Sequence, residues 1–306
     1  MDTHPDAPPA AVVVQRPMRW LVGLRTMGRL FAFSVGSWLV VAGGWRAVLS
    51  PFPARWRRSC APVSRWARWG ARCLGVRVSV SGAVPPPGSL VVANHQGYAD
   101  IVTIGGLFPT IFAARHDMRR WPMFGALAAA GATIFINRDV KRASWRGVAQ
   151  VAAALAAGAT VVAFPEGTST DGRGLLPLRT GVFQAAVEAQ APVVPAAIRY
   201  TAVGGRPIDE ATRPHVGWYD GSDFFRHLLR LAGYGQVEAT VLLGEPIPPP
   251  HTDRRSLAAA AEARLRSLLG FAPDQVPEVR GRVSRPEGSG PTSRGDAGGW
   301  PGPAQG

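Results

Sequence analysis

Acidic residues are missing from most of the first third of this 306-residue sequence, because neither aspartate nor glutamate occurs between Ala7 and Ala99. The same stretch holds twelve arginines and six of the ten tryptophans, so most of the net charge of +14 lies there. A basic surface rich in tryptophan is typical of proteins that lie against anionic lipid headgroups. Nucleic acid would also attract this charge, but no nucleic-acid-binding motif accompanies it, and we expect no nucleic-acid partner.

Cysteine is scarce as well, since Cys60 and Cys73 are the only two, which excludes a disulfide scaffold and a cysteine-rich zinc module. Charged residues make up only 18% of the chain and apolar residues 46%, which excludes a wholly disordered chain and predicts a sizeable core. Two motifs are absent. The chain has no Gly-x-Ser-x-Gly elbow, which argues against a lipid hydrolase, and no Gly-x-x-x-x-Gly-Lys loop, which argues against nucleotide binding.

Residues 30–45 form an uncharged run of sixteen residues. As a helix this run would be about 24 Å long, whereas a hydrocarbon core is about 30 Å thick. Arginines flank it on both sides, so the positive-inside rule selects no orientation. We interpret residues 17–75 as a membrane-associating helical segment in which residues 30–45 are embedded in one leaflet or lie at the interface. A tilted single span and a buried soluble helix are the alternatives.

The rest of the chain predicts an α/β fold, with a mixed, mainly parallel sheet flanked by helices. The expected strands are short, mostly continuous apolar runs, as in sheets buried on both faces: residues 76–80, 90–93, 110–113, 133–136, 160–164, 193–199 and 237–243. A helix capped by Asp139 is expected to run through residues 148–155 and to stop at Gly158, and another to span residues 253–269. We expect one catalytic domain over residues 76–271, with disordered ends at 1–16 and 272–306.

His95 has the most distinctive surroundings of the six histidines, because it follows an apolar strand within Asn94-His95-Gln96-Gly97-Tyr98-Ala99-Asp100. On a regular helix, His95 and Asp100 would lie about 140° apart. They can meet only if His95 sits in the turn before the helix, and Gly97 allows such a bend. A carboxylate on one imidazole nitrogen would leave the other as a general base. The alternative is a hydrogen bond that only holds the turn.

Three further segments follow or enter expected strands. The first is Phe164-Pro165-Glu166-Gly167-Thr168-Ser169. Its Glu166 could accept hydrogen bonds from a polyol or order a nearby arginine, or the segment could be a plain polar turn. Residues 131–138 end in Asn137-Arg138, whose guanidinium could bind phosphate or carboxylate, or could be merely solvated. The third, residues 191–197, contains two prolines and is interpreted as architectural.

In this order and spacing, the four segments resemble the blocks of the glycerolipid acyltransferases typified by 1-acyl-glycerol-3-phosphate acyltransferase. Asn94–Asp100 matches the NHx4D box, residues 134–138 the second block, residues 164–168 the FPEGT box and residues 192–195 the fourth block. The resemblance covers roughly residues 76–243. An HxxxxD pattern alone is weak evidence, but four blocks in order are highly specific.

The resemblance implies an O-acyltransferase on the cytoplasmic face of the inner membrane, which transfers a fatty acyl group to the free hydroxyl of a lysophospholipid. His95 would deprotonate that hydroxyl and Asp100 would orient His95. Arg138, Glu166, Gly167 and Thr168 would hold the acceptor's headgroup. The acyl donor would be acyl-CoA or acyl carrier protein, both anionic, and no bound cofactor or metal is implied.

One departure concerns the residue after the FPEGT box, where many relatives that use lysophosphatidate have arginine and this chain has Ser169. The continuation through Asp171-Gly172, followed by Trp218-Tyr219 and residues 227–231, is similar to the branch that includes lyso-ornithine lipid acyltransferases. A lyso-ornithine lipid is therefore the alternative acceptor. Arg173 or Arg179 could replace the missing charge. A non-catalytic membrane-binding protein on the same scaffold is disfavoured because His95 and Asp100 are both present.

Overall fold

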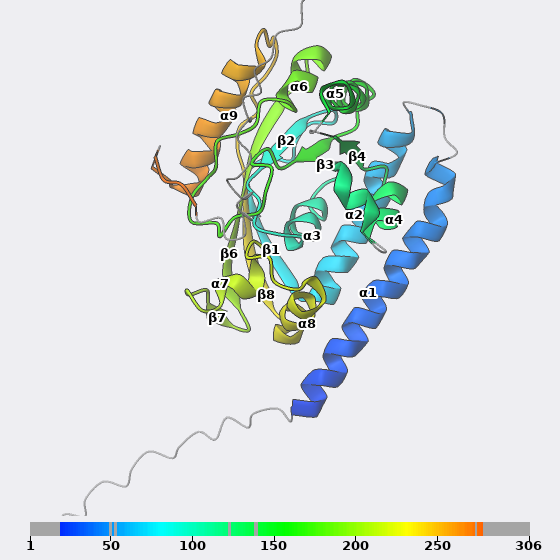
Figure 1. Ribbon diagram of the computed structural model, residues 1–306, viewed down its shortest axis with the longest axis vertical. Helices are drawn as coiled ribbons and strands as arrows, with labels where there is room; N and C mark the ends of the chain where they lie inside the picture. Colours follow the sequence, from blue (N-terminus) through cyan, green and yellow to red (C-terminus); the bar gives the residue numbers. More distant parts are fainter. Residues whose placement is uncertain are drawn as a thin grey trace, which may run out of the picture.

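A central sheet of eight strands, with helices on both faces, makes up most of the computed structural model, which describes residues 19–48, 51, 54–121, 124–137, 140–272 and 274–277 (Figure 1). The strands are β1 Val76–Ser81, β2 Leu90–Ala93, β3 Ile111–Arg115, β4 Ile134–Ile136, β5 Val161–Ala163, β6 Val193–Val203, β7 Arg206–Pro207 and β8 Val237–Leu243. The helices are α1 Arg19–Val48, α2 Ala54–Leu74, α3 Ala99–Gly105, η1 His116–Arg120 (a 3₁₀ helix), α4 Phe124–Ala130, α5 Lys141–Ala156, α6 Phe183–Ala189, α7 Arg213–Val216, α8 Phe224–Tyr234 and α9 Arg254–Leu269.

The sheet is mixed and mainly parallel, as the sequence predicts. Its strand order is β1-β8-β6-β2-β5-β3-β4, with β7 paired to the outer part of β6. Strands β6, β2, β5, β3 and β4 run parallel to one another, and β8 pairs antiparallel with β6 and parallel with β1. All seven predicted strands are confirmed. The sequence missed β7, which has only two residues, and it placed the end of β3 two residues early.

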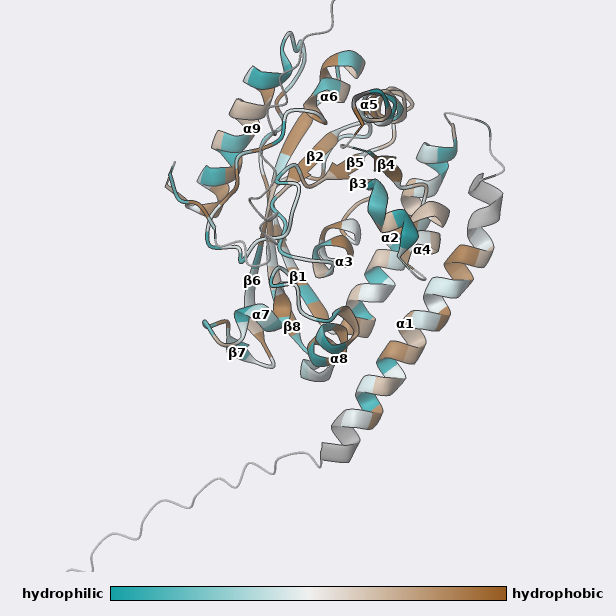
Figure 2. Ribbon diagram, in the orientation of Figure 1, coloured by the Kyte–Doolittle hydropathy of each residue, from teal (hydrophilic) through white to brown (hydrophobic). Residues whose placement is uncertain are grey.

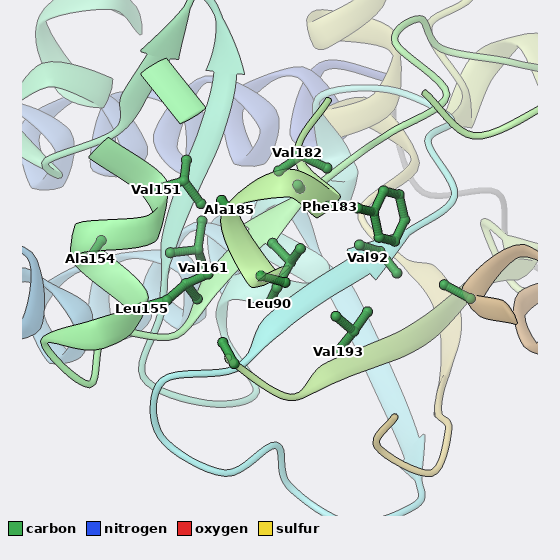
Figure 3. Packing of buried hydrophobic residues seen from close by; sticks show 14 of the residues in the cluster. Leu90, Val92, Val151, Ala154, Leu155, Val161, Val182, Phe183, Ala185 and Val193 are labelled. Carbon is green, nitrogen blue, oxygen red and sulfur yellow. The ribbon is translucent and has the colours of Figure 1, made fainter. Parts of the chain in front are cut away.

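Alternate residues of the central strands face two separate cores, because successive side chains of a strand point to opposite sides of the sheet. Figure 3 shows Leu90 and Val92 of β2 packed with Val151 of α5 and Phe183 of α6 on one face. On the other face, Val91 belongs to a second core that contains residues of α2, α3 and α8. Burial on both faces explains why these strands read as continuous apolar runs.

The helix ends follow the predicted signals where the structure describes them. Helix α5 ends at Ala156, two residues before Gly158, whose φ of +81° suits glycine. Helix α9 begins after Asp253, whose side chain accepts hydrogen bonds from the amides of Arg255 and Ser256. The predicted cap Asp139 lies outside the described residues. So do the expected disordered ends, except residues 272 and 274–277.

Residues 274–277 differ from the prediction of a disordered tail. The side-chain amide of Gln275 donates to the carbonyl of Arg173, and the Gln275 carbonyl accepts from Arg266 at 3.0 Å. The Arg266 side chain is itself buried and donates to the carbonyl of Leu175 at 2.7 Å. This short segment therefore makes hydrogen bonds that hold the loop after β5 in place.

Helix α1 is longer than the uncharged run predicts, because it continues on the N-terminal side past Arg29 and Arg25 for a total of 30 residues. One side of it packs on the body of the protein, where Phe33 and Ser37 are buried and the Trp66 indole donates to the Ser37 hydroxyl at 3.0 Å. Figure 2 shows brown, hydrophobic bands along α1. The side away from the body leaves apolar side chains exposed at helical spacing: Leu24, Met27, Phe31, Val35, Trp38 and Leu39.

The 21 residues from Gly23 to Gly43 are long and apolar enough to cross a membrane by length and composition, and 11% of their most apolar window is buried. This exposure contradicts the alternative of a buried soluble helix. Helix α2, in contrast, is part of the body of the protein, since Trp56 and Leu74 are each 2% exposed and belong to the two cores. Helix α2 thus packs with the sheet in both cores, and Leu30 of α1 also packs against the second core.

Candidate active site

Three neighbouring parallel strands end at one edge of the sheet and place polar residues there. His95 lies two residues after β2, Glu166 three residues after β5, and Arg115 is the last residue of β3. Strand β5 pairs with both β2 and β3, so these three ends are adjacent. The carboxyl edge of an open α/β sheet is where such proteins form their sites.

The predicted meeting of His95 and Asp100 is confirmed by the geometry. The Nδ1 atom of His95 lies 2.8 Å from Oδ2 of Asp100. His95 sits in the turn before α3, and Asp100 lies in the first turn of that helix. Gly97 is required at the bend, because a Cβ atom at this position would lie 2.7 Å from the backbone nitrogen of Trp218. The sharp turn therefore overcomes the angular offset of a regular helix.

Asp100 is completely buried and its carboxylate receives four donors. Besides His95, the amides of Gln96 and Gly97 donate to Oδ2 at 2.6 and 3.0 Å, and the Tyr200 hydroxyl donates to Oδ1 at 2.8 Å. Donors on both oxygens match an ionised carboxylate. Since the Nδ1–H of His95 points at this carboxylate, the lone pair of its neutral ring is on Nε2. Burial raises the pKa of Tyr200 well above its usual value, so its hydroxyl keeps its proton.

The backbone of His95 is held on both sides. Its amide donates to Oε1 of Glu166 at 2.7 Å, and its carbonyl accepts from the amide of Thr170 at 2.8 Å. Its imidazole ring stacks on Phe164 with the ring centroids 4.3 Å apart. Residues of the FPEGT box and of the two positions that follow it therefore fix where the imidazole lies.

The sequence predicts that Glu166 holds the acceptor's headgroup. Its side chain is 2% exposed, and its second oxygen accepts from the amide of Leu176 at 3.0 Å. Both carboxylate oxygens are thus bonded to the backbone, and burial raises the pKa of Glu166 to about 8 despite these two donors. The side chain joins the loop of His95 to the loop after β5 and does not line the pocket described below.

Sequence reasoning missed the partners that β6 supplies. The Asn94 side chain pairs with both backbone groups of Ile198, at 2.7 and 2.9 Å, and Gln96 also donates to the Ile198 carbonyl at 3.0 Å. These bonds attach the NHx4D box to a neighbouring strand more than 100 residues away in the chain. The side chains on either side of His95 are therefore anchors, while His95 itself remains 22% exposed.

A pocket of about 290 Å³ opens in front of His95. Gly167, Thr168 and Ser169 line it, as do Arg115 and Asp117, which the sequence analysis did not single out. Arg138 lies outside the described residues. Neither Arg173 nor Arg179 lines this pocket, and the Arg173 guanidinium instead forms ion pairs with Asp171 and Glu210. Within the described lining, the charge missing at Ser169 is therefore not replaced by either arginine.

An almost purely apolar cavity of about 120 Å³ adjoins this pocket. The two spaces share the side chains of Tyr98, Ile101, Phe112 and Trp121 as walls. On its far side the apolar cavity shares Val40 and other residues with a wide groove of about 1050 Å³ between α1 and α2. Apolar walls thus extend from the imidazole to the helix that exposes apolar side chains.

Tyr98 is held at the junction of the two spaces. Its hydroxyl lies 2.8 Å from Nδ1 of His227, and Nε2 of His227 lies 3.0 Å from the carbonyls of Pro214 and Gly217. With its Nε2–H between two carbonyls, the imidazole accepts from Tyr98. Burial lowers the pKa of His227, which keeps the ring neutral. Over the described residues, no group of three or more histidines, cysteines or carboxylates is arranged to hold a metal ion.

Comparison with known proteins places this arrangement in a family. The model of the acyltransferase family matches residues 75–199, from β1 into β6. The chain is 34% identical to a lyso-ornithine lipid O-acyltransferase of Rhizobium meliloti over 226 residues, which are 71% of this chain and 76% of that protein. It is 33% identical to a 1-acyl-sn-glycerol-3-phosphate acyltransferase of Neisseria gonorrhoeae over 144 residues, 47% of this chain and 56% of that one.

The fold also has a solved counterpart. The crystal structure of the 1-acyl-sn-glycerophosphate acyltransferase of Thermotoga maritima superposes with a TM-score of 0.56 and 21% identity, over 83% of this chain and 97% of that chain. That likeness concerns the fold alone. The similarity to the Rhizobium enzyme extends over three quarters of its length, and the family model spans both the His95 and the Glu166 segments, so the chain belongs to the acyltransferase family.

Proposed function

We propose that this acyltransferase moves a fatty acyl group from an acyl thioester to the free hydroxyl of a lysolipid during membrane lipid synthesis. The observation that carries the proposal is the hydrogen-bonded His95–Asp100 pair at a pocket that continues into an apolar cavity. A base must reach the hydroxyl while the fatty chain stays out of water. The adjoining spaces meet both needs.

His95 acts as the general base and Asp100 as its orienting carboxylate. As the acceptor oxygen attacks the thioester carbonyl, its proton passes to Nε2 of His95, and the imidazolium is stabilised by the buried carboxylate. The carbon–sulfur bond then breaks, and the thiolate leaves with the proton that the imidazolium returns. No covalent bond to the protein forms. Positioning the two reactants against one another lowers the barrier further.

The apolar cavity between Tyr98, Phe112 and the outer helices receives a fatty chain. Its walls offer no charged group among the described residues that form it, so an alkyl chain leaves water there without stranding a buried charge. The groove between α1 and α2 leads from this cavity to the exposed apolar side of α1. Lipid substrates can therefore enter from the membrane side.

Gly167, Thr168 and Arg138 contact the acceptor's headgroup in this proposal, and the headgroup has two candidates. A lyso-ornithine lipid is favoured, because the relatives named for it match a larger share of the chain and because no arginine follows Thr168. A 1-acyl-glycerol-3-phosphate is the second candidate, supported by the 33% identical relatives named for it. The donor is acyl-CoA or acyl carrier protein, both anionic partners for a chain of net charge +14.

A panel of acceptors and donors tests this proposal. Purified protein in mixed micelles is incubated with lyso-ornithine lipid, lysophosphatidate or lysophosphatidylethanolamine, each with acyl-CoA and with acyl carrier protein. We expect acyl transfer to at least one lysolipid, with a higher kcat/KM for lyso-ornithine lipid than for lysophosphatidate. A strong preference for lysophosphatidate would contradict our interpretation of Ser169, and no transfer to any lysolipid would contradict the proposal.

The outer side of α1 holds the protein on the cytoplasmic face of the inner membrane. Its exposed apolar stripe lies on a helix whose other side contacts α2, α4 and α8, so the helix runs along the catalytic body. This arrangement favours an interfacial helix over a single span. Arg25 is exposed beside the stripe and can meet anionic headgroups.

Charged substitutions on this stripe are expected to release the protein from membranes while leaving it folded. We choose Phe31→Glu and Leu39→Glu, because both side chains are more than two-thirds exposed, at 72% and 69%, and touch little of the protein. Flotation with vesicles that contain anionic lipid should fall several-fold for the double variant. The matched control is Val80→Glu on the edge strand β1, which is 53% exposed but distant from the stripe in sequence and element. If the double variant floated as well as the Val80→Glu control, the membrane contact would have to lie outside this stripe.

Substitution of Glu166 distinguishes positioning from headgroup binding. Glu166→Ala leaves the amides of His95 and Leu176 without their acceptor, each at a cost of about 1–3 kcal/mol when buried. Glu166→Gln retains one acceptor and should be milder. Because His95 would lose its anchor, kcat should fall in the order wild type, Gln, Ala with little change in the acceptor KM. A selective rise in the acceptor KM would instead show that Glu166 contacts the headgroup directly.

A further inference from the structure

Among the described residues that line the active-site pocket, the two formally charged side chains form one ion pair. Nε of Arg115 donates to Oδ1 of Asp117 at 3.1 Å, and its Nη2 lies 2.8 Å from Oδ2, which makes a forked ion pair. Arg115 ends β3 and Asp117 lies in the first turn of η1, where it also accepts from the amide of Met118. The two side chains are about half exposed, at 51% and 47%, so each can bind a second partner.

This pair sets the charge of the pocket. Among the described residues that line it, Arg115 and Asp117 are the only formally charged ones, so the described lining apart from His95 is neutral overall. A phosphate monoester carries up to two negative charges, and Asp117 would repel it. A headgroup with one positive and one negative charge would instead match both members of the pair.

The walls beside the pair suit the positive charge. Trp121 and Trp218 both line the pocket, with their ring centroids 5.4 Å apart in an edge-to-face arrangement, and the ring centroid of Tyr98 lies 6.2 Å from that of Trp218. An ammonium group is attracted to the faces of such rings, most strongly to tryptophan. Aromatic walls next to a carboxylate are therefore a favourable environment for a primary ammonium.

We infer that Arg115 and Asp117 determine acceptor specificity by binding a zwitterionic amino-acid headgroup, with the carboxylate on Arg115 and the ammonium on Asp117 against the tryptophans. This inference rests on the proposed function and adds to it the two residues that recognise the headgroup. An ornithine acylated on one amine retains one carboxylate and one ammonium, which is the required pair of charges. The guanidinium of Arg115 then faces the headgroup carboxylate, and the carboxylate of Asp117 faces the headgroup ammonium. Both contacts lie in the pocket in which the free hydroxyl approaches His95.

The test pairs a substitution in the protein with one in the substrate. Wild type, Asp117→Asn, Arg115→Gln and the double variant are assayed with lyso-ornithine lipid, with the analogue in which norvaline replaces ornithine, and with lysophosphatidate. Norvaline lacks only the terminal amine. Asp117→Asn should lower kcat/KM for the ornithine acceptor by about 10- to 100-fold, the range of a lost charged hydrogen bond, and leave the norvaline acceptor unchanged.

The other arms separate contact from general electrostatics. The double variant leaves the net charge of the described lining unchanged. If the contact with the headgroup is direct, this variant should nevertheless lose the preference for the ornithine acceptor over the norvaline acceptor. Asp117→Asn should raise the use of lysophosphatidate, and Arg120→Gln, on the same helix but not in the pocket lining, should change no acceptor's kcat/KM by more than about twofold.

The contrary results are distinct. Equal loss on the ornithine and norvaline acceptors would mean that Asp117 only holds η1, and would overturn the inference. A wild type that acylates lysophosphatidate but not the ornithine acceptor would also overturn it, while leaving lysolipid acylation intact. A wild type that acylates no lysolipid would remove the proposed function itself, together with the inference that rests on it.

Discussion

His95→Ala is expected to reduce acyl transfer by about 10²- to 10⁴-fold, the usual contribution of a general base. Nothing else in the described pocket lining combines a partner such as Asp100 with a free imidazole nitrogen. The ring is 22% exposed, and Asp100 keeps its three other donors when the imidazole is removed, so the variant should fold and bind vesicles as the wild type does. Initial rates at saturating acceptor and donor, with circular dichroism alongside, make the measurement.

The matched control is His215→Ala, which removes a half-buried histidine that bonds to Tyr234 and does not line the pocket. Its rate should stay within a few-fold of the wild-type rate. A His95→Ala enzyme that also stays within a few-fold would remove His95 from the mechanism, and the pair with Asp100 would then serve only to hold the turn.

Asp100→Asn is the second substitution for which we expect a loss of about 10²- to 10⁴-fold. An amide oxygen at the place of Oδ2 can still accept from His95, Gln96 and Gly97, and the Tyr200 hydroxyl can rotate to accept from the new amide. The geometry is thus largely kept while the charge that stabilises the imidazolium is removed. Rates and thermal unfolding of the same preparation separate the two effects.

Tyr200→Phe is the control for that experiment. It removes one of the four donors to Asp100 but leaves the carboxylate charged and in contact with His95. Its rate should fall by less than about tenfold, the scale of one lost hydrogen bond. Similar losses for Tyr200→Phe and Asp100→Asn would indicate that packing around the carboxylate matters more than its charge.

The sheet and the histidine–aspartate pair could be predicted because their signals are local. Strands buried on both faces are short apolar runs in the sequence. The turn before α3 is marked by Gly97, where the neighbouring backbone leaves no room for a Cβ atom. The length of α1 could not be read from its uncharged run. Arg29 bounds the run on its N-terminal side and Arg25 precedes it, but arginine side chains at the surface of a helix do not end the helix.

The partners of the site could not be predicted, because they come from distant segments. The Glu166 carboxylate faces the interior because it accepts a hydrogen bond from the amide of Leu176. Tyr200 reaches Asp100 from β6, 100 residues away in the chain. Arg115 and Asp117 escape prediction for a simpler reason. The apolar run predicts the end of β3 at residue 113, so both residues fall beyond the predicted end of the strand.

In the proposed mechanism the acyl group passes directly from the thioester to the lysolipid. The measurement that tests this transfer compares the amounts of the two products, free thiol and acylated lipid. Purified protein, acyl-CoA and the preferred lysolipid are mixed, and the free thiol released is compared with the acylated lipid formed, with and without the lysolipid. The His95 mechanism predicts one thiol for each acylated lipid and almost no thiol without the acceptor. Thiol release at the same rate in the absence of the lysolipid, with no acylated lipid to match it, would identify a thioester hydrolase and contradict the account.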